Sequence, residues 1–179
     1  MRLILLAAAA TLLATACSST PPTPALSTAK MALANLASSS GSLVSGKVTL
    51  MPMGAGVHLT GTVGGLPPNS IHGFHVHEKG DCSAVDASSA GAHFNPLDSK
   101  HGRASASAHH AGDMDNLSSN ARGVATVDVH MKGVTLGGGA INDIAGRALV
   151  VHAVADDYTS QPTGNAGARV ACGVIRVTP

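Results

Sequence analysis

The stretch GFHVHEKGDC, Gly73–Cys82, places two histidines, His75 and His77, one residue apart. In a β-strand, side chains two residues apart lie on the same face, so these two imidazoles would converge on one point. That point is either a metal site or an ordinary wet strand surface, and the two residues alone do not decide between them. The segments on either side of this strand have to supply the answer.

Composition favours one domain with an aliphatic core. The chain has 179 residues, a formal net charge of +1 and a single Tyr and two Phe as its only aromatic residues. Its length is sufficient for a substantial core, which must be built from Val, Leu, Ile and Ala. Lys and Arg are scattered, and stacking platforms are missing, so a nucleic-acid partner is not expected. The unusual feature is the ten histidines.

Short strand-like segments alternate with Gly- and Pro-rich turns along most of the chain. The predicted strands cover residues 29–37, 43–51, 56–63, 71–77, 122–131, 147–154 and 169–177. The first segment fits helix and strand equally, and we interpret it as a strand because every later segment is β. Pro52 and Gly54 predict a hairpin between the second and third. The pattern predicts an all-β, closed or sandwiched antiparallel domain.

Two long polar stretches, residues 81–121 and 156–168, interrupt this rhythm. Loops of this length in a compact domain are usually functional. The first is rich in groups that bind metals, and a later strand adds another: His93, His101, His109, His110, Asp113 and His152. Imidazole suits copper and zinc, and three His with one Asp suit zinc. A zinc finger is excluded because the chain has no Cys-x-x-Cys.

The N-terminal sequence MRLILLAAAATLLATAC predicts a secretory signal peptide at residues 1–16, too short to span a membrane. Two forms of processing are open. Small residues before Cys17 fit ordinary cleavage, whereas LATAC is similar to a bacterial lipobox, in which Cys17 would carry a lipid. Ala14 departs from the usual Leu of that motif, but the Ser/Thr/Pro-rich tether at residues 17–28 favours an anchored protein. We expect a periplasmic protein, with a lipoprotein as one of the two forms.

The cysteine count agrees with export. Of three cysteines, Cys17 would serve the anchor, which leaves Cys82 and Cys172 as a pair. In an oxidising compartment this pair is expected to form a disulfide. Closing so long a loop would stabilise the fold by about 4–5 kcal/mol on the chain-entropy model.

Six separated motifs now point to one family. GFHVHEKGDC, GAHFNP, KHG, HAGD, GRALVVHAVADD and GNAGARVACGVIRV resemble the copper/zinc superoxide dismutases in their exported bacterial form. The resemblance covers residues 29–179 and implies a Greek-key β-barrel or sandwich of about eight strands with two long functional loops. It also implies the disproportionation of superoxide to dioxygen and hydrogen peroxide by copper that cycles between Cu(II) and Cu(I). Each subunit would hold one copper and one zinc ion.

Carried over to this chain, the resemblance implies two ligand sets that share His93 as an imidazolate bridge. The copper ligands would be His75, His77, His93 and His152, and the zinc ligands His93, His101, His110 and Asp113. His93 and Arg169 would be catalytic, with Arg169 holding the anion. Asp156 would link a copper histidine to a zinc histidine, and Cys82–Cys172 would tie the ligand loop to the Arg169 strand. His72 would bond to backbone.

Other features stay as ordinary surface or as open alternatives. His58, His109 and His130 match no ligand position, and we expect His109 to face solvent. Basic residues in or near the ligand loop could steer the anion: Lys79, Lys100 and Arg103. The oligomeric state is open, since exported bacterial members occur as monomers and homodimers. Two other functions are considered, a copper buffer or chaperone on the same fold and a purely structural surface lipoprotein.

Overall fold

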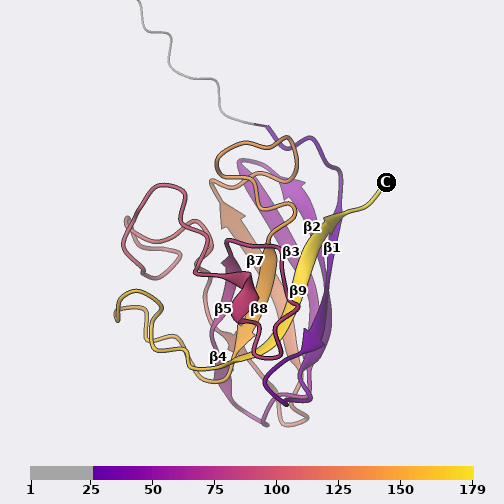
Figure 1. The fold of residues 1–179 in the computed structure, drawn as a ribbon, viewed down its shortest axis with the longest axis vertical. Coiled ribbons are helices and arrows are strands. Elements are labelled where there is room, and N and C mark those ends of the chain that lie inside the picture. The colour runs from indigo at the N-terminus through magenta and orange to yellow at the C-terminus, as the bar shows by residue number, and fades with distance from the viewer. Residues whose placement is uncertain (1–25) are drawn as a thin grey trace, which may run out of the picture.

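The structure, a computed structural model, describes residues 26–179 (Figure 1). The predicted signal peptide, Cys17 and most of the tether therefore lie outside the described residues. The strands are β1 (Ala32–Ser38), β2 (Ser45–Met53), β3 (Gly56–Gly64), β4 (Ile71–His72), β5 (Phe74–His77), β6 (Leu117–Ser118), β7 (Ala125–Lys132), β8 (Ala148–His152) and β9 (Arg169–Val177). Within residues 26–179 the only other regular element is the 3₁₀ turn η1 (Ser88–Ala90). No helix in this range is long and apolar enough to cross a membrane.

Seven strands form one curled sheet in the order β5-β8-β9-β1-β2-β3-β7, and β4 pairs with β6 in a second, two-stranded sheet (Figure 1). All strand pairs are antiparallel. Because β3 pairs with β7 and β9 lies between β8 and β1, several neighbours are distant in sequence, as in a Greek key. The predicted all-β class is confirmed.

The predicted strands are largely confirmed, including the β2–β3 hairpin and the first strand. The segment 71–77 differs, because Gly73 divides it into β4 and β5. The N–H of Gly73 donates to the carbonyl of Val154 over 2.9 Å, and its carbonyl accepts from the N–H of His152 over 2.8 Å. A Cβ on Gly73 would lie 2.8 Å from the Cβ of Ala166. The break thus admits a close approach of the segment after β8.

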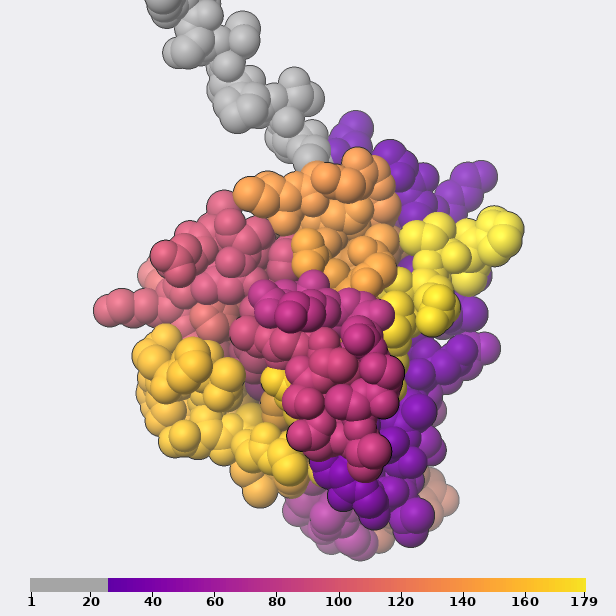
Figure 2. Space-filling model, viewed as in Figure 1, coloured from indigo at the N-terminus to yellow at the C-terminus, as the bar shows by residue number. Residues whose placement is uncertain are grey.

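The two walls of the barrel are buried differently. On β2, β3 and β7 the burial alternates, so that one face packs in the core and the other meets solvent. By contrast, all five residues of β8 are buried. On its outer face, Ala148 and Val150 pack in a small apolar cluster with Ala87 and Ala90 of the loop after β5. Figure 2 shows the loops that follow β5 and β8 lying over this side of the molecule. A strand buried on both faces reads as a continuous apolar run, as residues 147–154 do.

Candidate metal centre

Seven buried side chains form two clusters of groups that could hold metal ions. One cluster contains His75, His77, His93 and His152, and the other contains His93, His101, His110 and Asp113. Within each cluster, one ligand atom per residue lies within 4.8 Å of all the others. Every one of these residues is at most 5% exposed. The structure therefore brings together all the ligand residues that the resemblance predicted, with His93 in both clusters.

Strand β5 supplies the first two histidines. Its alternation sends Phe74 and Val76 into the hydrophobic core, so His75 and His77 lie on the opposite face. The neighbouring strand β8 ends at His152, where its register against β9 shifts. The ring centroids of His75 and His152 are 5.0 Å apart. Two adjacent strands thus place three imidazoles on one outward face, beneath the long loops.

The loop after β5 returns to the strand and brings the remaining groups. Isolated antiparallel bridges join His77 to His93 and His75 to Asp113. The ring of His93 therefore lies between the clusters, with its centroid 4.0 Å from that of His75 and 5.4 Å from that of His101. Its Nδ1 lies 2.9 Å from an oxygen of Asp113.

Outer hydrogen bonds fix the direction of each strand imidazole. His77 donates from Nδ1 to the carbonyl of Gly91 over 2.9 Å, and His152 donates from Nδ1 to the carbonyl of Gly167 over 3.2 Å. His75 instead donates from Nε2 to Asp156 over 2.8 Å. In each ring the other nitrogen is directed into the first cluster, and the two Nε2 atoms of His77 and His152 are 3.3 Å apart. Such outer partners orient metal ligands and set the tautomer.

Unpartnered nitrogens show that this donor set fits metal ions. Four buried ring nitrogens have no hydrogen-bond partner in the described residues: Nδ1 of His75, Nε2 of His93, Nδ1 of His101 and Nδ1 of His110. A buried polar atom without a partner needs an explanation. A cation within each cluster would supply it. Four imidazoles suit copper, and three imidazoles with a carboxylate suit zinc.

Burial favours the neutral form of three histidines of the first cluster, His77, His93 and His152, and metal ligands must be neutral. Burial lowers the pKa of His152 to about 3, with a further contribution from His75. Burial likewise lowers the pKa of His93 to about 4, although its hydrogen bond with Asp113 opposes the shift. The pKa of His77 is also well below its usual value, chiefly because of burial.

Two carboxylates determine the electrostatics of the second cluster, Asp113 within it and Asp156 beside it. Burial raises the pKa of Asp113, but the close approach of His101, His110 and His93 outweighs this and holds the pKa well below its usual value. Burial lowers the pKa of His101, but its contacts with Asp113 and Asp156 outweigh this and raise it to about 9. This cluster therefore attracts positive charge.

Asp156 connects the two clusters from outside. Its Oδ2 accepts from His75 over 2.8 Å, and its Oδ1 accepts from Nε2 of His101 over 3.0 Å. Asn116 holds the backbone of Asp156 at both ends, accepting from its N–H and donating to its carbonyl over 2.9 Å each. A Cβ at Gly164 would overlap the Asp156 carboxylate, so only glycine fits there. Sequence reasoning missed Asn116, which no motif marks.

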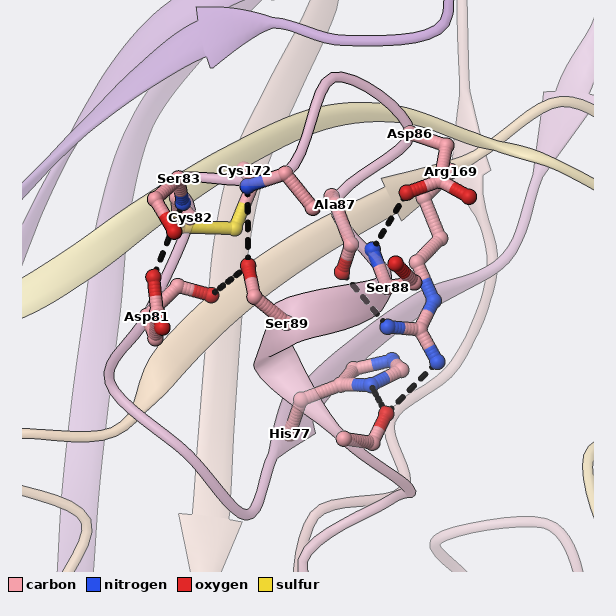
Figure 3. The surroundings of a disulfide bond; sticks show 12 residues. His77, Asp81, Cys82, Ser83, Asp86, Ala87, Ser88, Ser89, Arg169 and Cys172 are labelled. Carbon is pink, nitrogen blue, oxygen red and sulfur yellow. Dashed lines mark hydrogen bonds between the residues drawn. A yellow bond between two sulfur atoms is a disulfide. The ribbon is translucent and has the colours of Figure 1, made fainter.

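Arg169 lies half-buried beside the first cluster (Figure 3). Nη1 donates to the carbonyl of Ala87 and Nη2 donates to the carbonyl of Gly91, each over 2.6 Å. The Gly91 carbonyl also accepts from His77, so one oxygen joins the arginine to a cluster histidine. Burial lowers the pKa of Arg169, and nearby Asp86 opposes that shift. These acceptors were not predicted, because backbone carbonyls carry no sequence signature.

The predicted disulfide is confirmed. Cys82 is bonded to Cys172 across 90 residues of sequence, which attaches the loop that carries Ala87 and Gly91 to strand β9 (Figure 3). Within this loop, the hydroxyl of Ser89 donates to the carbonyl of Asp81 over 2.9 Å, and the N–H of Ser88 donates to Asp86 over 3.0 Å. The loop is therefore held at its base and along its length.

The remaining histidines and basic residues lie outside both clusters. His72 donates from Nδ1 to the carbonyl of His152 over 2.8 Å, as expected from the resemblance. His109 is half-buried rather than fully solvent-facing, because its Nδ1 bonds to the carbonyl of His110. All three steering candidates, Lys79, Lys100 and Arg103, are exposed, and Nε of Arg103 lies 3.1 Å from Asp115.

Comparison with known proteins gives one consistent result. Residues 44–175 match the family described as copper/zinc superoxide dismutase (SODC). Superoxide dismutase [Cu-Zn] 2 of Aquifex aeolicus (strain VF5) is 45% identical over 136 residues, which is 74% of this chain and 80% of that protein. Superoxide dismutase [Cu-Zn] 1 of the same organism is 43% identical over 134 residues, 73% of this chain and 79% of that protein.

A solved structure agrees in fold. It is described as the clock protein EA4, has a TM-score of 0.75 and 37% sequence identity, and covers 86% of this chain and 98% of its own. The family match includes both long loops and every residue of the two clusters.

Proposed function

The chain belongs to the copper/zinc superoxide dismutase family, and from that premise we propose that its two buried clusters are the metal sites of the enzyme. As a member, it catalyses the disproportionation of superoxide to dioxygen and hydrogen peroxide and uses copper and zinc. We assign copper to His75, His77, His93 and His152, and zinc to His93, His101, His110 and Asp113.

The position of His93 carries this assignment. Its Nδ1 is directed to Asp113, 2.9 Å away in the second cluster. Its Nε2 is buried and has no partner among the described residues. One imidazole with its two nitrogens facing different donor sets is the arrangement that a shared, bridging ligand requires.

Copper supplies the one-electron oxidation and reduction when bound, whereas zinc has no accessible redox change and orders its ligand loop. Two superoxide anions and two protons yield one dioxygen and one hydrogen peroxide. The protein must therefore attract anions, hold them at the copper cluster and deliver protons to the reduced product.

Arg169 is proposed to hold the anion. Its two carbonyl partners fix the guanidinium beside His77 without neutralising its charge. A fixed cation attracts a small anion without having to reorganise when the anion arrives. The attraction of Arg169 for the anion therefore comes from the fold of the chain and does not require either metal.

His93 is proposed to supply a proton from Nε2, the nitrogen on the copper side. Because burial lowers the pKa of His93 to about 4, a proton that Nε2 takes up from solvent during the reaction would be held weakly and passed on to a more basic acceptor such as peroxide. Asp113 fixes the ring through Nδ1, which keeps Nε2 aimed at the first cluster.

The disulfide and the similarity to bacterial relatives support export of this protein from the cytoplasm. We further propose that residues 1–16 are removed as a signal peptide and that the mature chain, with its tether at 17–28 and its domain at 29–179, resides in the periplasm. Lipidation of Cys17 and ordinary cleavage are distinguished by intact mass. Assembly as a homodimer is distinguished from a monomer by sedimentation.

The proposed function is tested on the purified mature protein by metal analysis and superoxide-dependent activity. We expect one copper and one zinc per chain and activity that cyanide inhibits. Copper-loaded protein without turnover would instead support a metal buffer or chaperone. Protein with neither metal after loading would overturn the assignment of both clusters.

A further inference from the structure

The guanidinium group of Arg147, the residue directly before β8, contacts residues that adjoin the two clusters. The carbon Cζ of Arg147 lies 3.6 Å from the centroid of the Phe94 ring. Its Nε donates to the carbonyl of Asp143 over 2.6 Å, and its Nη1 donates to the carbonyl of Glu78 over 2.8 Å. The planar group thus applies its face to an aromatic ring and its edge to two backbone oxygens.

Phe94 links three ligand-bearing segments through its backbone. Its N–H donates to the carbonyl of Val76, the residue between the two histidines of β5, over 2.8 Å. Its carbonyl accepts from the N–H of Gly112, the residue before the aspartate of the second cluster, over 2.9 Å. The N–H of Val76 closes the ring of bonds by donating to Gly112 over 2.9 Å. Movement of Phe94 would therefore move ligands of both clusters.

The second contact of Arg147 is with the backbone of Glu78, the residue after His77. The N–H of Glu78 donates to the carbonyl of Ala92, the residue before His93, over 2.9 Å. The Glu78 carbonyl faces the other way and accepts from Arg147. Arg147 consequently contacts the chain immediately after His77 and the side chain immediately after His93.

We propose that Arg147 is a positioning residue of the metal centre, which fixes the places of His77 and His93 by clamping the Glu78 carbonyl and the Phe94 ring. This inference rests on the proposed function, because it takes those two histidines as metal ligands. Phe94 is only 3% exposed, so its ring is fixed by packing and offers Arg147 a rigid surface. A lysine ammonium cannot cover the ring and bond both carbonyls at once.

The test uses the full mature protein loaded with copper and zinc, in the variants Arg147→Gln, Arg147→Lys and Phe94→Leu. Arg147→Gln is expected to bind both metals but to show a changed Cu(II) electron paramagnetic resonance spectrum. Its zinc should pass to a chelator about 10-fold faster, the low end of the about 10–100-fold loss of metal affinity that follows removal of a direct partner of a ligand. Arg147→Lys and Phe94→Leu are expected to show smaller changes of the same kind.

Two controls separate positioning from general stability. Arg176→Gln removes an exposed arginine on β9, and Val127→Ala weakens the core on β7. Both should keep the wild-type copper spectrum and zinc release rate, although Val127→Ala lowers the melting temperature.

An Arg147→Gln protein with the wild-type spectrum and zinc release would overturn the positioning role, even if it melts earlier. If this variant does not fold, wild-type values in Arg147→Lys and Phe94→Leu would overturn it equally. Should the wild-type protein be active while these variants match it, only the clamp fails. A wild-type protein that binds no copper would overturn the proposed function and the clamp together.

Discussion

The histidines on the two walls of the barrel differ in surroundings rather than in local sequence. His58 on β3 and His130 on β7 are cross-strand partners, yet His58 bonds to Asp128 over 2.7 Å and His130 to the carbonyl of Met53 over 3.0 Å. They lie on the wall whose outer face meets solvent. His75 and His77 occupy an equally ordinary strand position on β5, but the long loops cover them.

The comparison teaches that cover makes a strand histidine a candidate ligand. An exposed imidazole finds water or a neighbouring side chain, so a bound ion gains little over the existing partners. Under the loops, Nδ1 of His75 and Nε2 of His93 are buried and have no partner among the described residues. A metal ion offsets the cost of leaving these atoms without hydrogen bonds.

The largest expected effect is the loss of activity when the covered wall loses its shared histidine. His93→Ala removes the residue that both clusters share, and we expect activity to fall by more than about 100-fold, since losing even an outer partner of a ligand costs about 10–100-fold. His130→Ala on the open wall should retain wild-type activity and metal content. Metal analysis and an activity assay check both variants, and a fully active His93→Ala protein would contradict the assignment.

Weakening the open wall should change stability without changing the metal centre. Leu59 is fully buried on β3, and Leu59→Ala is expected to lower the free energy of unfolding by about 2–5 kcal/mol. Urea unfolding measures this loss. The copper spectrum of the loaded protein should stay that of the wild type, and an altered spectrum would mean that the two walls are not independent.

Removing Asp156, which links the two clusters, should weaken metal binding at both. Asp156→Asn keeps the size of the side chain but cannot accept from both His75 and His101 with charged oxygens. We expect copper and zinc affinities to fall by about 10–100-fold. Competition with chelators measures each metal separately. A loss confined to one metal would show that Asp156 supports only that site.

The anion site should be separable from the metals. Arg169→Ala is expected to leave both metals bound and to lower the rate by about 10-fold, with the larger difference at low salt, because the fixed charge acts through screened electrostatics. Rates measured across ionic strengths provide the test. Loss of copper in this variant would instead make Arg169 structural.

The smallest effect concerns the metal-free protein and pH. His93 and His152 take up protons in the unfolded chain at about 6.5 but in the folded protein only at about 4 and about 3. Stability should therefore fall as the pH drops from about 6.5 towards 4. The pKa of His101 is raised to about 9, so its contribution is present below 6.5 and is lost as the pH rises through 9.

Metal-free protein should accordingly be most stable near pH 6.5, with thermal melts at several pH values as the measurement. His101→Gln should remove the decline on the alkaline side. Stability that keeps rising to pH 9 in the unaltered chain would contradict the expected role of His101.

Much of the fold could be predicted from the sequence because strand alternation is a local signal. It predicted the hairpin of β2 and β3, the strand β7 and the final strand β9. The division at Gly73 was missed, because it follows from the packing of Ala166, which is distant in sequence. The burial of both faces of β8 also depends on a loop that folds over it.

The candidate site divides in the same way. Side chains in recognisable motifs, such as His75, His93 and Arg169, could be predicted as members of one centre. The carbonyls of Ala87 and Gly91 could not, since every residue has one and only the folded loop aims them. Asn116 and Arg147 act through backbone and ring contacts, which their residue types do not announce.

The double burial of β8 also has a cost before folding is complete. Until the Cys82–Cys172 bond closes and the loop carrying Ala87 and Ala90 covers it, the five-residue strand Ala148–His152 presents an apolar face to water. Newly exported chains would be vulnerable to sticking together through this face. Oxidation of two thiols would then do more than strengthen the finished molecule, because it would also shorten the time for which this apolar face is open to water.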